Sequence, residues 1–383
     1  MPRCSSKLLL VATCASLCGA TPALLASPKD WIRQLDALNA MPVAGNAVDT
    51  KAAYLNFLSS VLTSSSLECN SASDDNAFLE CAYPMRMGRA WPKLGVTMAG
   101  HMRLQNIMDL LLRVHEAGVG GSYLEAGVWR GGMSIFATAV VEVYGLDRKV
   151  YLCDSFEGLP PPREGSLRAD ETAYVEEGFK QSLSMGEAHV ADNFRMYGVP
   201  MERVQLVKGF FVNSLPILRE QLIARNERLS VLRMDGDMYD STIDILYSLY
   251  DRVAVGGYVV IDDFGWFDGT EPGSRAVWGA KDAVLDFRRV HGIEDAAHTM
   301  HDIDGWAAYF QKRREVTLQR DLYLRCVQTK DYTPLQPTPK LTPTDYNHLL
   351  NVYTRYANHS HRRQRNSQDF HHGMRAFGPW RPG

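Results

Sequence analysis

The sequence predicts an α/β fold, in which a mostly parallel β-sheet carries helices on both faces. Between about residues 120 and 265, short apolar segments alternate with longer segments whose apolar residues recur every three or four positions. Several of the short segments end directly on glycine or aspartate, as LRMDGD and VVIDDF do. Strands that alternate with helices are typical of right-handed crossover connections, which produce a parallel sheet.

An amphipathic helix over residues 101–118, which ends at Gly118, is predicted just before this region. The short segments that follow are rich in β-branched and aromatic residues, so we expect strands. The predicted strands are 121–127, 149–156, 204–211, 229–237 and 256–264, and the predicted helices between them are 132–145, 214–225 and 241–253. The last strand candidate is GWAAYFQK (305–312), with VTLQRDLYLRCV (316–327) close behind it.

Composition is that of a globular protein. Of the 383 residues, 45% are hydrophobic and 22% are charged, and the formal net charge is −3. A net charge this close to zero provides no general positive field for nucleic acid, so we expect no nucleic-acid partner.

The N-terminal segment resembles a targeting sequence. Arg3 and Lys7 precede an apolar run that carries no charge until Lys29, which is typical of a secretory signal peptide. We therefore expect a targeting peptide over residues 1–26 and a location in the secretory pathway or outside the cell. A plastid or mitochondrial transit peptide is the alternative. Pro22 and polar residues interrupt the run, so we expect no stable transmembrane span.

The remaining chain divides into three regions. Residues 27–90 are predicted to form a helical region that contributes a lid, residues 91–330 the α/β domain, and residues 331–383 a Pro/Thr-rich linker with a basic, disordered tail. Cys69 and Cys81 flank a polar segment of the helical region, and the sequence leaves open whether they are disulfide-bonded or free.

Ligands of an open parallel sheet bind at the carboxyl ends of its strands. The first strand ends in Glu125-Ala-Gly127-Val-Trp-Arg-Gly131-Gly, where glycines allow a tight turn and the next helix presents free N–H groups. The spacing is not that of the dinucleotide motif G-x-G-x-x-G. An acidic residue before the turn also favours a cationic or zwitterionic ligand over a pyrophosphate.

The next two strand ends are suited to a nucleoside. Asp154 ends the second strand, where a carboxylate can accept the ribose hydroxyls of either NAD or S-adenosylmethionine. Phe210 and Phe211 end the third strand and could enclose an adenine ring, although packing in the core is the stronger reading for both.

Asp235, Asp237, Asp262 and Asp263 end the fourth and fifth strands. Carboxylates gathered at neighbouring strand ends repel one another unless they are protonated or share a cation. All-oxygen ligation favours Mg²⁺, with Mn²⁺ or Ca²⁺ as alternatives. The structural alternative is helix capping, which we expect of the residues that follow, Asp240 and Ser241.

Five motifs occur in order between about residues 85 and 311: RAWPKLGVTMAGHMRLQN, LEAGVWRGG, LCDSFEGLP, LRMDGDMYDST and GGYVVIDDF. Together they resemble the macrocin O-methyltransferase family, whose members use S-adenosylmethionine and Mg²⁺ to methylate sugar hydroxyls of macrolides. The resemblance implies a Rossmann-like class I methyltransferase fold, with a seven-stranded sheet whose last strand is antiparallel.

The resemblance also implies roles for individual residues. The cofactor's methionine part is assigned to the turn after the first strand, its ribose to the end of the second, and closure over the cofactor to the upstream block. The implied cofactor residues are Glu125, Gly127, Trp129, Arg130 and Gly131; Asp154, Ser155 and Phe156; and Thr97, Met98 and Arg103, while Asp235, Asp262 and Asp263 are the implied metal ligands. Phe211 completes the predicted cofactor site.

Asp235 is the residue we expect to act as both metal ligand and catalytic base. Methyl transfer requires an acceptor oxygen that is deprotonated and aligned with the methyl group. Weaker candidates for the base are Asp237, His298, His301 and Asp304. The acceptor is predicted to be a hydroxyl of a small molecule or glycan, with a sugar-type vicinal diol favoured; the oligomeric state is left open, with a homo-oligomer allowed.

Three other functions are compatible with parts of the pattern. Asp235-Gly-Asp237 also matches the D-x-D motif of metal-dependent glycosyltransferases, which would not need the second acidic pair at 262 and 263. An NAD-dependent oxidoreductase is disfavoured by the glycine spacing. A catalytically silent cofactor-binding protein is disfavoured because all the matched acidic positions are present.

Overall fold

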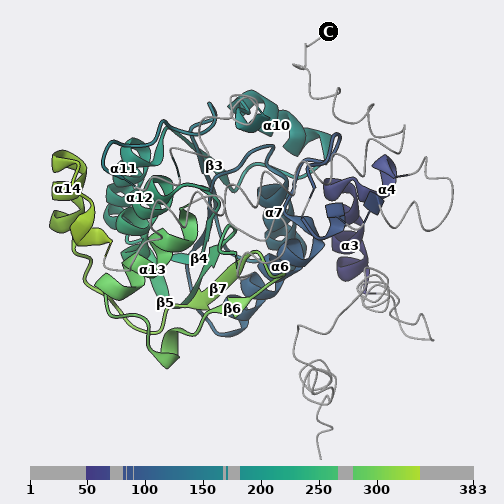
Figure 1. Ribbon diagram of the computed structural model, residues 1–383. Coiled ribbons are helices and arrows are strands. Elements are labelled where there is room, and N and C mark those ends of the chain that lie inside the picture. The colour runs from purple at the N-terminus through teal and green to yellow at the C-terminus, as the bar shows by residue number, and fades with distance from the viewer. Residues whose placement is uncertain are drawn as a thin grey trace, which may run out of the picture. The chain divides into compact units, whose positions relative to one another are not determined.

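The computed structural model describes residues 49–69, 81–82, 84–88, 90–166, 170, 182–265 and 279–336 (Figure 1). The predicted targeting peptide and the part of the predicted linker and tail beyond residue 336 lie outside these residues. Residues 331–336, which were assigned to the linker, are described, and Tyr332 and Leu335 are buried there. The chain divides into two compact units, residues 1–101 and 102–383.

The larger unit is built on a seven-stranded sheet with the strand order β3-β2-β1-β4-β5-β7-β6. Strands β1 to β5 run parallel, and β7 is antiparallel to both β5 and β6. This arrangement confirms the predicted fold class, including the antiparallel last strand. The strands are β1 (Ser122–Ala126), β2 (Val150–Asp154), β3 (Val204–Lys208), β4 (Leu229–Met234), β5 (Val253–Ile261), β6 (His301–Asp302) and β7 (Ala308–Gln311).

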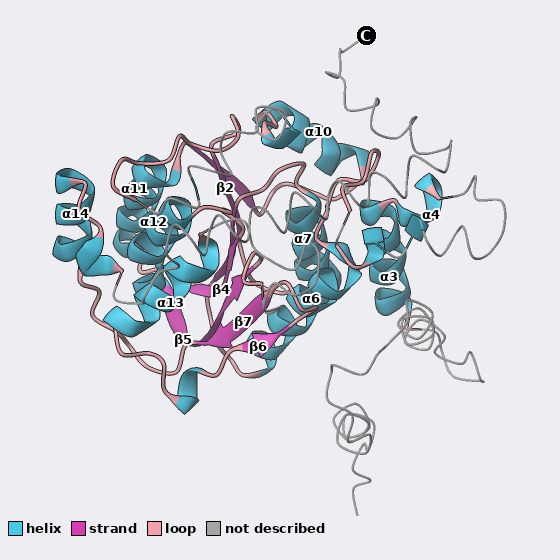
Figure 2. Cartoon of the chain, viewed as in Figure 1, coloured by secondary structure: helices cyan, strands magenta, loops and turns pink. Residues whose placement is uncertain are grey.

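Helices cover both faces of the sheet. Figure 2 shows α11, α12 and α13 on one side of the strands and α6 and α7 on the other. The segment at 316–327, whose type the sequence left open, contains a helix. The helices of this unit are α6 (Gly100–Glu116), α7 (Gly132–Tyr144), α10 (Glu187–Met196), α11 (Phe211–Ala224), α12 (Tyr239–Leu249), α13 (Ala280–Val290) and α14 (Arg320–Thr329), with short 3₁₀ turns at Tyr250–Arg252, Ala296–His298 and Thr333–Leu335.

The core lies between the central strands and the helices that pack on them. Leu124 of β1, Leu232 of β4 and Val259 of β5 are completely buried. Tyr247 of α12 stacks on Tyr323 of α14 with ring centroids 4.8 Å apart, which attaches the last helix to α12. The central strands are therefore held from both sides, and their carboxyl ends are fixed in position.

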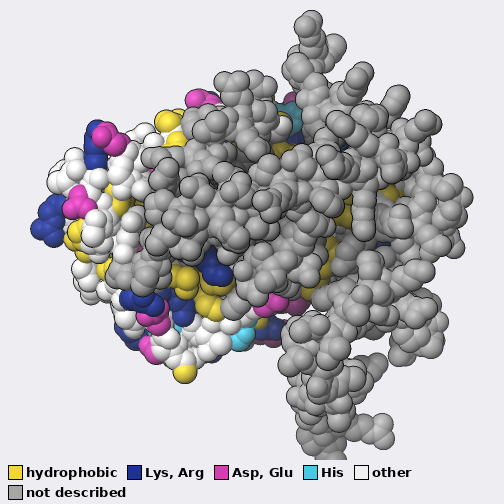
Figure 3. All heavy atoms as spheres, in the orientation of Figure 1, with side chains coloured by type: hydrophobic (Ala, Val, Ile, Leu, Met, Phe, Trp, Pro, Cys, Tyr) yellow, Lys and Arg dark blue, Asp and Glu magenta, His cyan; other side chains and the backbone are white. Residues whose placement is uncertain are grey.

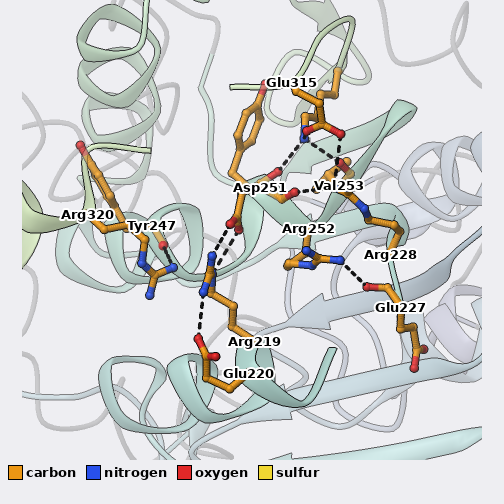
Figure 4. Close-up of polar contacts among 12 residues, drawn as sticks. Arg219, Glu220, Glu227, Arg228, Tyr247, Asp251, Arg252, Val253, Glu315 and Arg320 are labelled. Atoms are coloured by element: carbon orange, nitrogen blue, oxygen red, sulfur yellow. Dashed lines mark hydrogen bonds and ion pairs between the residues drawn. The ribbon is translucent and has the colours of Figure 1, made fainter. Parts of the chain in front are cut away.

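A polar network stabilises the opposite, amino ends of the central strands (Figure 4). Arg219 of α11 pairs with Asp251 at 2.5 Å, two residues before β5 begins. Arg228 donates to the Asp251 carbonyl at 2.8 Å, and Arg252 donates to the Glu227 carbonyl at 3.0 Å. These contacts join α11 to the amino ends of β4 and β5, far along the strands from the predicted site.

The smaller unit contains α3 (Thr50–Thr63) and α4 (Ser65–Glu68). Asp49 caps α3 by accepting hydrogen bonds from the N–H groups of Lys51 and Ala52. Cys69 and Cys81 form a disulfide, with Cα atoms 5.6 Å apart, which answers the question that the sequence left open.

The described surface is mixed in charge. Figure 3 shows basic and acidic side chains interspersed over the described part of one face. Within the described ranges, every helix is too short or too polar to cross a lipid bilayer.

The disulfide gives a first testable prediction. A peptide map under non-reducing conditions should recover the Cys69 and Cys81 peptides linked, because the two residues are bonded in the folded chain. Cys153 and Cys326 are buried free thiols and should react with an alkylating reagent only after unfolding. Recovery of Cys69 and Cys81 as separately alkylated thiols, without prior reduction, would contradict this assignment.

Candidate active site

A glycine turn joins β1 to α7 and lies directly against the end of β4. Gly127 has φ of +94° and donates its N–H to the Cys153 carbonyl at 2.9 Å. A Cβ atom at this position would lie 1.7 Å from the carbonyl oxygen of Asp235, a distance that no side chain can occupy. Gly131, with φ of +88°, then forms the N-cap of α7. The predicted cofactor turn and the predicted metal ligand are therefore in contact through backbone.

Asp154, at the end of β2, supports this turn. Its Oδ2 accepts the N–H of Val128 at 2.7 Å and that of Trp129 at 3.4 Å, and its Oδ1 accepts the N–H of Phe156 at 2.8 Å. Burial raises the pKa of Asp154, and these backbone donors oppose the rise. Asp154 thus holds the turn in shape, and its predicted contact with a ribose stays a prediction.

The remaining residues predicted for the cofactor surround this turn or precede α6. Ser155 donates to the Gly158 carbonyl at 2.6 Å, and Phe156 has φ of +58°. Trp129 donates its ring N–H to the Ser182 carbonyl at 2.8 Å, and the Arg130 guanidinium lies 4.2 Å from the Trp129 ring centroid.

Phe211 begins α11 and packs, partly buried, against the main hydrophobic core. Its ring would be 3.4 Å from a Cβ added at Gly236, so it lies close to the end of β4. Thr97 and Met98 belong to the smaller unit, where Thr97 Oγ1 accepts the N–H of Ala99 at 3.1 Å. The cofactor contacts of all three residues stay predictions.

The three predicted metal ligands gather at one point. One carboxylate oxygen from each of Asp235, Asp262 and Asp263 lies within 4.8 Å of the others. The register explains this, because Met234 of β4 pairs with Ile261 of β5 and the Asp262 N–H donates to the Met234 carbonyl at 2.9 Å. Parallel neighbouring strands thus end at the same level and place their next residues side by side.

Two buried arginines occupy the same cluster. Arg233 lies 2.6 Å from Glu125, 2.9 Å from Asp235 and 2.5 Å from Asp262. Arg103 of α6 lies 2.6 Å from Asp262 and 2.8 Å from Asp304. Sequence reasoning placed Arg103 in the block that closes over the cofactor and gave Arg233 no role.

A signal for Arg233 was present in the sequence. Glu125 and Arg233 lie within the predicted strands 121–127 and 229–237, and the structure pairs them in the register of β4 with β1. A charged residue in the middle of a buried strand needs a partner of opposite charge, and these two residues supply each other.

Glu125 lies within β1, and its side chain is almost entirely buried. Its carboxylate accepts hydrogen bonds from Arg233 and from Ser134 Oγ. Burial, only partly offset by Arg233 and Ser134, raises its pKa to about 8. The predicted role of Glu125 in cofactor binding stays a prediction, and its observed partners are groups of the protein.

The carboxyls of the cluster titrate differently because their neighbours differ. Burial and repulsion from Asp262 raise the pKa of Asp235 to about 6, against the attraction of Arg233. Burial acts to raise the pKa of Asp262 as well, but Arg103 and Arg233 hold it below its usual value. Burial and the neighbouring Asp235 raise the pKa of Asp263 well above its usual range. One ionised carboxylate, Asp262, is thus stabilised by the protein alone.

Asp237 lies at the same edge in a left-handed conformation, with φ of +57°. Its carbonyl accepts the N–H of Ala280 at 3.1 Å, at the start of α13. The predicted capping role of Asp240 is wrong. The N-cap of α12 is Met238, and the Asp240 carboxylate instead accepts the N–H of Arg163 at 2.8 Å.

The other candidates for the base have different surroundings. His298 is completely buried, where its Nδ1 contacts Asp295 at 2.7 Å. His301 is exposed in β6 and stacks on Tyr309, with ring centroids 5.0 Å apart. Asp304 is joined to the acidic cluster through Arg103.

A seven-stranded sheet of this order, with a glycine turn after β1 and acidic residues after β4 and β5, defines the methyltransferase class. A family model described as macrocin-O-methyltransferase (TylF) matches residues 44–312, which is more than half of the chain. The chain belongs to this family and is an enzyme of the S-adenosylmethionine-dependent methyltransferase class.

Individual relatives agree with this assignment. The chain is 36% identical over 231 residues, 60% of its length and 80% of the relative's, to the 8-demethyl-8-(2,3-dimethoxy-alpha-L-rhamnosyl)-tetracenomycin-C 4'-O-methyltransferase of Streptomyces olivaceus. It is 33% identical over 239 residues, 62% of its length and 85% of the relative's, to the mycinamicin III 3''-O-methyltransferase of Micromonospora griseorubida. Among solved structures, the O-methyltransferase NovP matches with a TM-score of 0.57 and 32% identity, covering 69% of this chain and all of that one.

The close approach at Gly127 gives the second testable prediction. Gly127→Ala should destabilise the protein by about 1–3 kcal/mol through overpacking and should abolish S-adenosylhomocysteine binding, because the new methyl must displace either the turn or Asp235. Gly145→Ala is the matched control, since Gly145 also has a positive φ but open space around its Cβ position. The control should cost about 1 kcal/mol and leave binding intact. Stability is measured by thermal denaturation and S-adenosylhomocysteine binding by calorimetry. If the two variants lose the same stability and bind S-adenosylhomocysteine equally well, the close approach of Gly127 to Asp235 does not shape the site.

Proposed function

We propose that this protein transfers a methyl group from S-adenosylmethionine to a hydroxyl of a small molecule or glycan, assisted by Mg²⁺ at Asp235, Asp262 and Asp263. The observation that carries the proposal is the convergence of three carboxylates within 4.8 Å, beside the glycine turn of β1. The turn would bind the cofactor, and the carboxylates would hold the metal that binds the acceptor hydroxyl. The methyl donor and the acceptor would therefore meet at the carboxyl ends of the strands.

The donor set fits a hard divalent cation. All three side chains offer oxygen, which Mg²⁺ prefers, and the set contains no cysteine or histidine. Asp263 Oδ2 is buried and has no hydrogen-bond partner within the described ranges, although a buried carboxylate oxygen normally has one. A cation would satisfy this oxygen and would reduce the repulsion among the carboxylates.

The acceptor is proposed to be a sugar-type hydroxyl, preferably one of a vicinal pair. The name of the relative from S. olivaceus includes a 2,3-dimethoxy rhamnosyl group and methylation at a 4' oxygen, which supports a sugar hydroxyl as acceptor. The vicinal pair has no support from this name and stays a prediction. A bound cation would orient two neighbouring hydroxyls and lower their pKa. The acceptor itself and a homo-oligomeric state stay predictions.

The residues of the chain have separate tasks in this reaction. The turn at Gly127 positions the cofactor against the end of β4, and methyl transfer then needs the acceptor oxygen in line with the sulfonium methyl group. Asp235 is the proposed base, since it stands where the turn and the acidic cluster meet. Asp237 is the second candidate, because Arg233 already holds Asp235 Oδ2, whereas Asp237 lies half-buried at the same edge.

The compartment is also a proposal. A disulfide between Cys69 and Cys81 is of the kind that persists in oxidising compartments, which supports the expected location in the secretory pathway. Free thiols at these positions in the protein isolated from its source would remove this support.

Cofactor binding is the third testable prediction. Isothermal titration calorimetry should detect binding of S-adenosylhomocysteine and no heat from UDP-sugars or NAD, because the turn lacks the dinucleotide glycine spacing and its first strand carries Glu125. A folded protein that binds a UDP-sugar and ignores S-adenosylhomocysteine would instead support the glycosyltransferase reading.

The fourth prediction separates the two candidate bases. Asp235→Asn should lose both Mg²⁺ binding and turnover, because the residue is proposed as ligand and base, while S-adenosylhomocysteine affinity stays near that of the unchanged protein. Asp237→Asn should keep Mg²⁺ binding and retain measurable turnover. The readouts are calorimetric titration with Mg²⁺ and transfer of a labelled methyl group to a panel of glycosides. If Asp237→Asn binds Mg²⁺ normally but is inactive, the role of base moves from Asp235 to Asp237.

A further inference from the structure

Arg233 is a deeply buried charged residue of the described chain that the proposed reaction itself does not require. Its side chain is 2% exposed, and it is the next-to-last residue of β4. Nη1 contacts Glu125 Oε1 at 2.6 Å and Asp235 Oδ2 at 2.9 Å, and Nη2 contacts Asp262 Oδ1 at 2.5 Å. A single planar guanidinium therefore bridges two of the three proposed metal ligands.

Asp262 is held from its other side by a second arginine. Its Oδ2 accepts from Arg103 Nη1 at 2.6 Å, so each oxygen is bound by a different guanidinium. Arg103 is itself held by Asp304, whose Oδ1 accepts the N–H groups of Trp306 at 3.0 Å and Ala307 at 2.8 Å. The orientation of the Asp262 carboxylate is thus fixed by groups from α6, from β4 and from the turn before β7.

We propose that Arg233, with Arg103, is a positioning residue that holds the Asp235 and Asp262 carboxylates in the geometry needed to bind the divalent cation. The inference rests on the proposed metal-dependent function. A planar guanidinium carries several N–H donors at fixed directions and can bind two carboxylates at once. A lysine ammonium is a compact charge without donors at these fixed positions. Because the carboxylates are ordered in advance, cation binding requires only that Asp263, with its unpartnered Oδ2, complete the set.

The competing explanation is that these ion pairs only stabilise the fold. Removing one partner of a buried pair is costly, so loss of stability alone does not separate the two explanations. Cation affinity of the folded protein does. Replacing an arginine that only stabilises the fold leaves the cation affinity of the folded protein unchanged. Replacing an arginine that positions the metal ligands lowers the cation affinity without changing the cofactor affinity.

The test is Arg233→Lys, which keeps the charge and removes the planar fork. Titration of Mg²⁺ and Mn²⁺ into the full-length protein with S-adenosylhomocysteine bound should show affinity reduced about 10–100-fold, the usual effect of losing a group that orients metal ligands. S-Adenosylhomocysteine affinity measured without metal should be unchanged. The Mg²⁺ concentration that gives half-maximal turnover should rise by the same factor, so that high Mg²⁺ restores the rate.

Arg219→Lys is the matched control. Arg219 pairs with Asp251 at 2.5 Å at the opposite edge of the sheet, so its replacement changes a guanidinium–carboxylate pair away from the acidic cluster (Figure 4). This variant should bind both cations with unchanged affinity. If Arg219→Lys loses as much cation affinity as Arg233→Lys, the effect is a general loss of order and the inference is overturned.

Arg103→Lys makes the test decisive if Arg233→Lys does not fold. Arg103 contacts only one of the ligands, Asp262, so the expected loss of cation affinity is at the lower end, about 10-fold. A folded variant at either position with unchanged affinity for both cations overturns the inference and leaves the proposed reaction standing. An unchanged protein that binds neither cation overturns the metal-dependent proposal and this inference together.

Discussion

Carboxylates at the carboxyl edge of this sheet repel one another, and the arrangement of the site depends on the cations that offset this repulsion. Asp235, Asp262 and Asp263 lie within 4.8 Å of one another in a largely buried place, where charges interact strongly and water screens them poorly. Arg233 and Arg103 offset part of this charge from within the protein. Burial, together with the repulsion that the arginines do not offset, raises the pKa values of Asp235 and Asp263. The same uncompensated repulsion suits the set to a divalent cation.

The backbone makes the second contribution. Because Gly127 has no side chain, the turn after β1 approaches the Asp235 carbonyl more closely than any other residue would allow. The Asp235 N–H donates to the Ala126 carbonyl at 2.8 Å, which fixes the two strand ends relative to each other. The position of the cofactor turn and the position of the acidic cluster are therefore not independent. A change that moves one moves the other, and this coupling suits a reaction in which two bound molecules must be aligned.

Most of the fold could be predicted from the sequence, because its strands are short apolar segments between helices of clear period. The predicted strands also indicated that Asp154, Asp235 and Asp262 lie near one another, since the carboxyl ends of parallel strands meet at one edge of the sheet. The parts that could not be predicted depend on contacts between distant residues. Arg103 and Asp304 are 201 positions apart, and nothing local in the sequence indicates that they pair.

Other differences have local causes. Asp240 carries a typical capping side chain, but α12 begins two residues earlier than a capping role would need, and its carboxylate accepts the N–H of Arg163 instead. The bond between Cys69 and Cys81 depends on a Cα separation of 5.6 Å that spacing alone does not give. Arg233 looked like one polar residue in a strand, and its three acidic partners became visible only when the register of β1, β4 and β5 was known.

Diffraction from crystals containing Mn²⁺ and S-adenosylhomocysteine, recorded at a wavelength where manganese scatters anomalously, would locate the cation directly. We expect a single strong anomalous peak within coordination distance of Asp235, Asp262 and Asp263, with the cofactor product against the turn at Gly127. A bound cofactor product with no anomalous peak at the three carboxylates, or with a peak elsewhere, would contradict the proposed metal site.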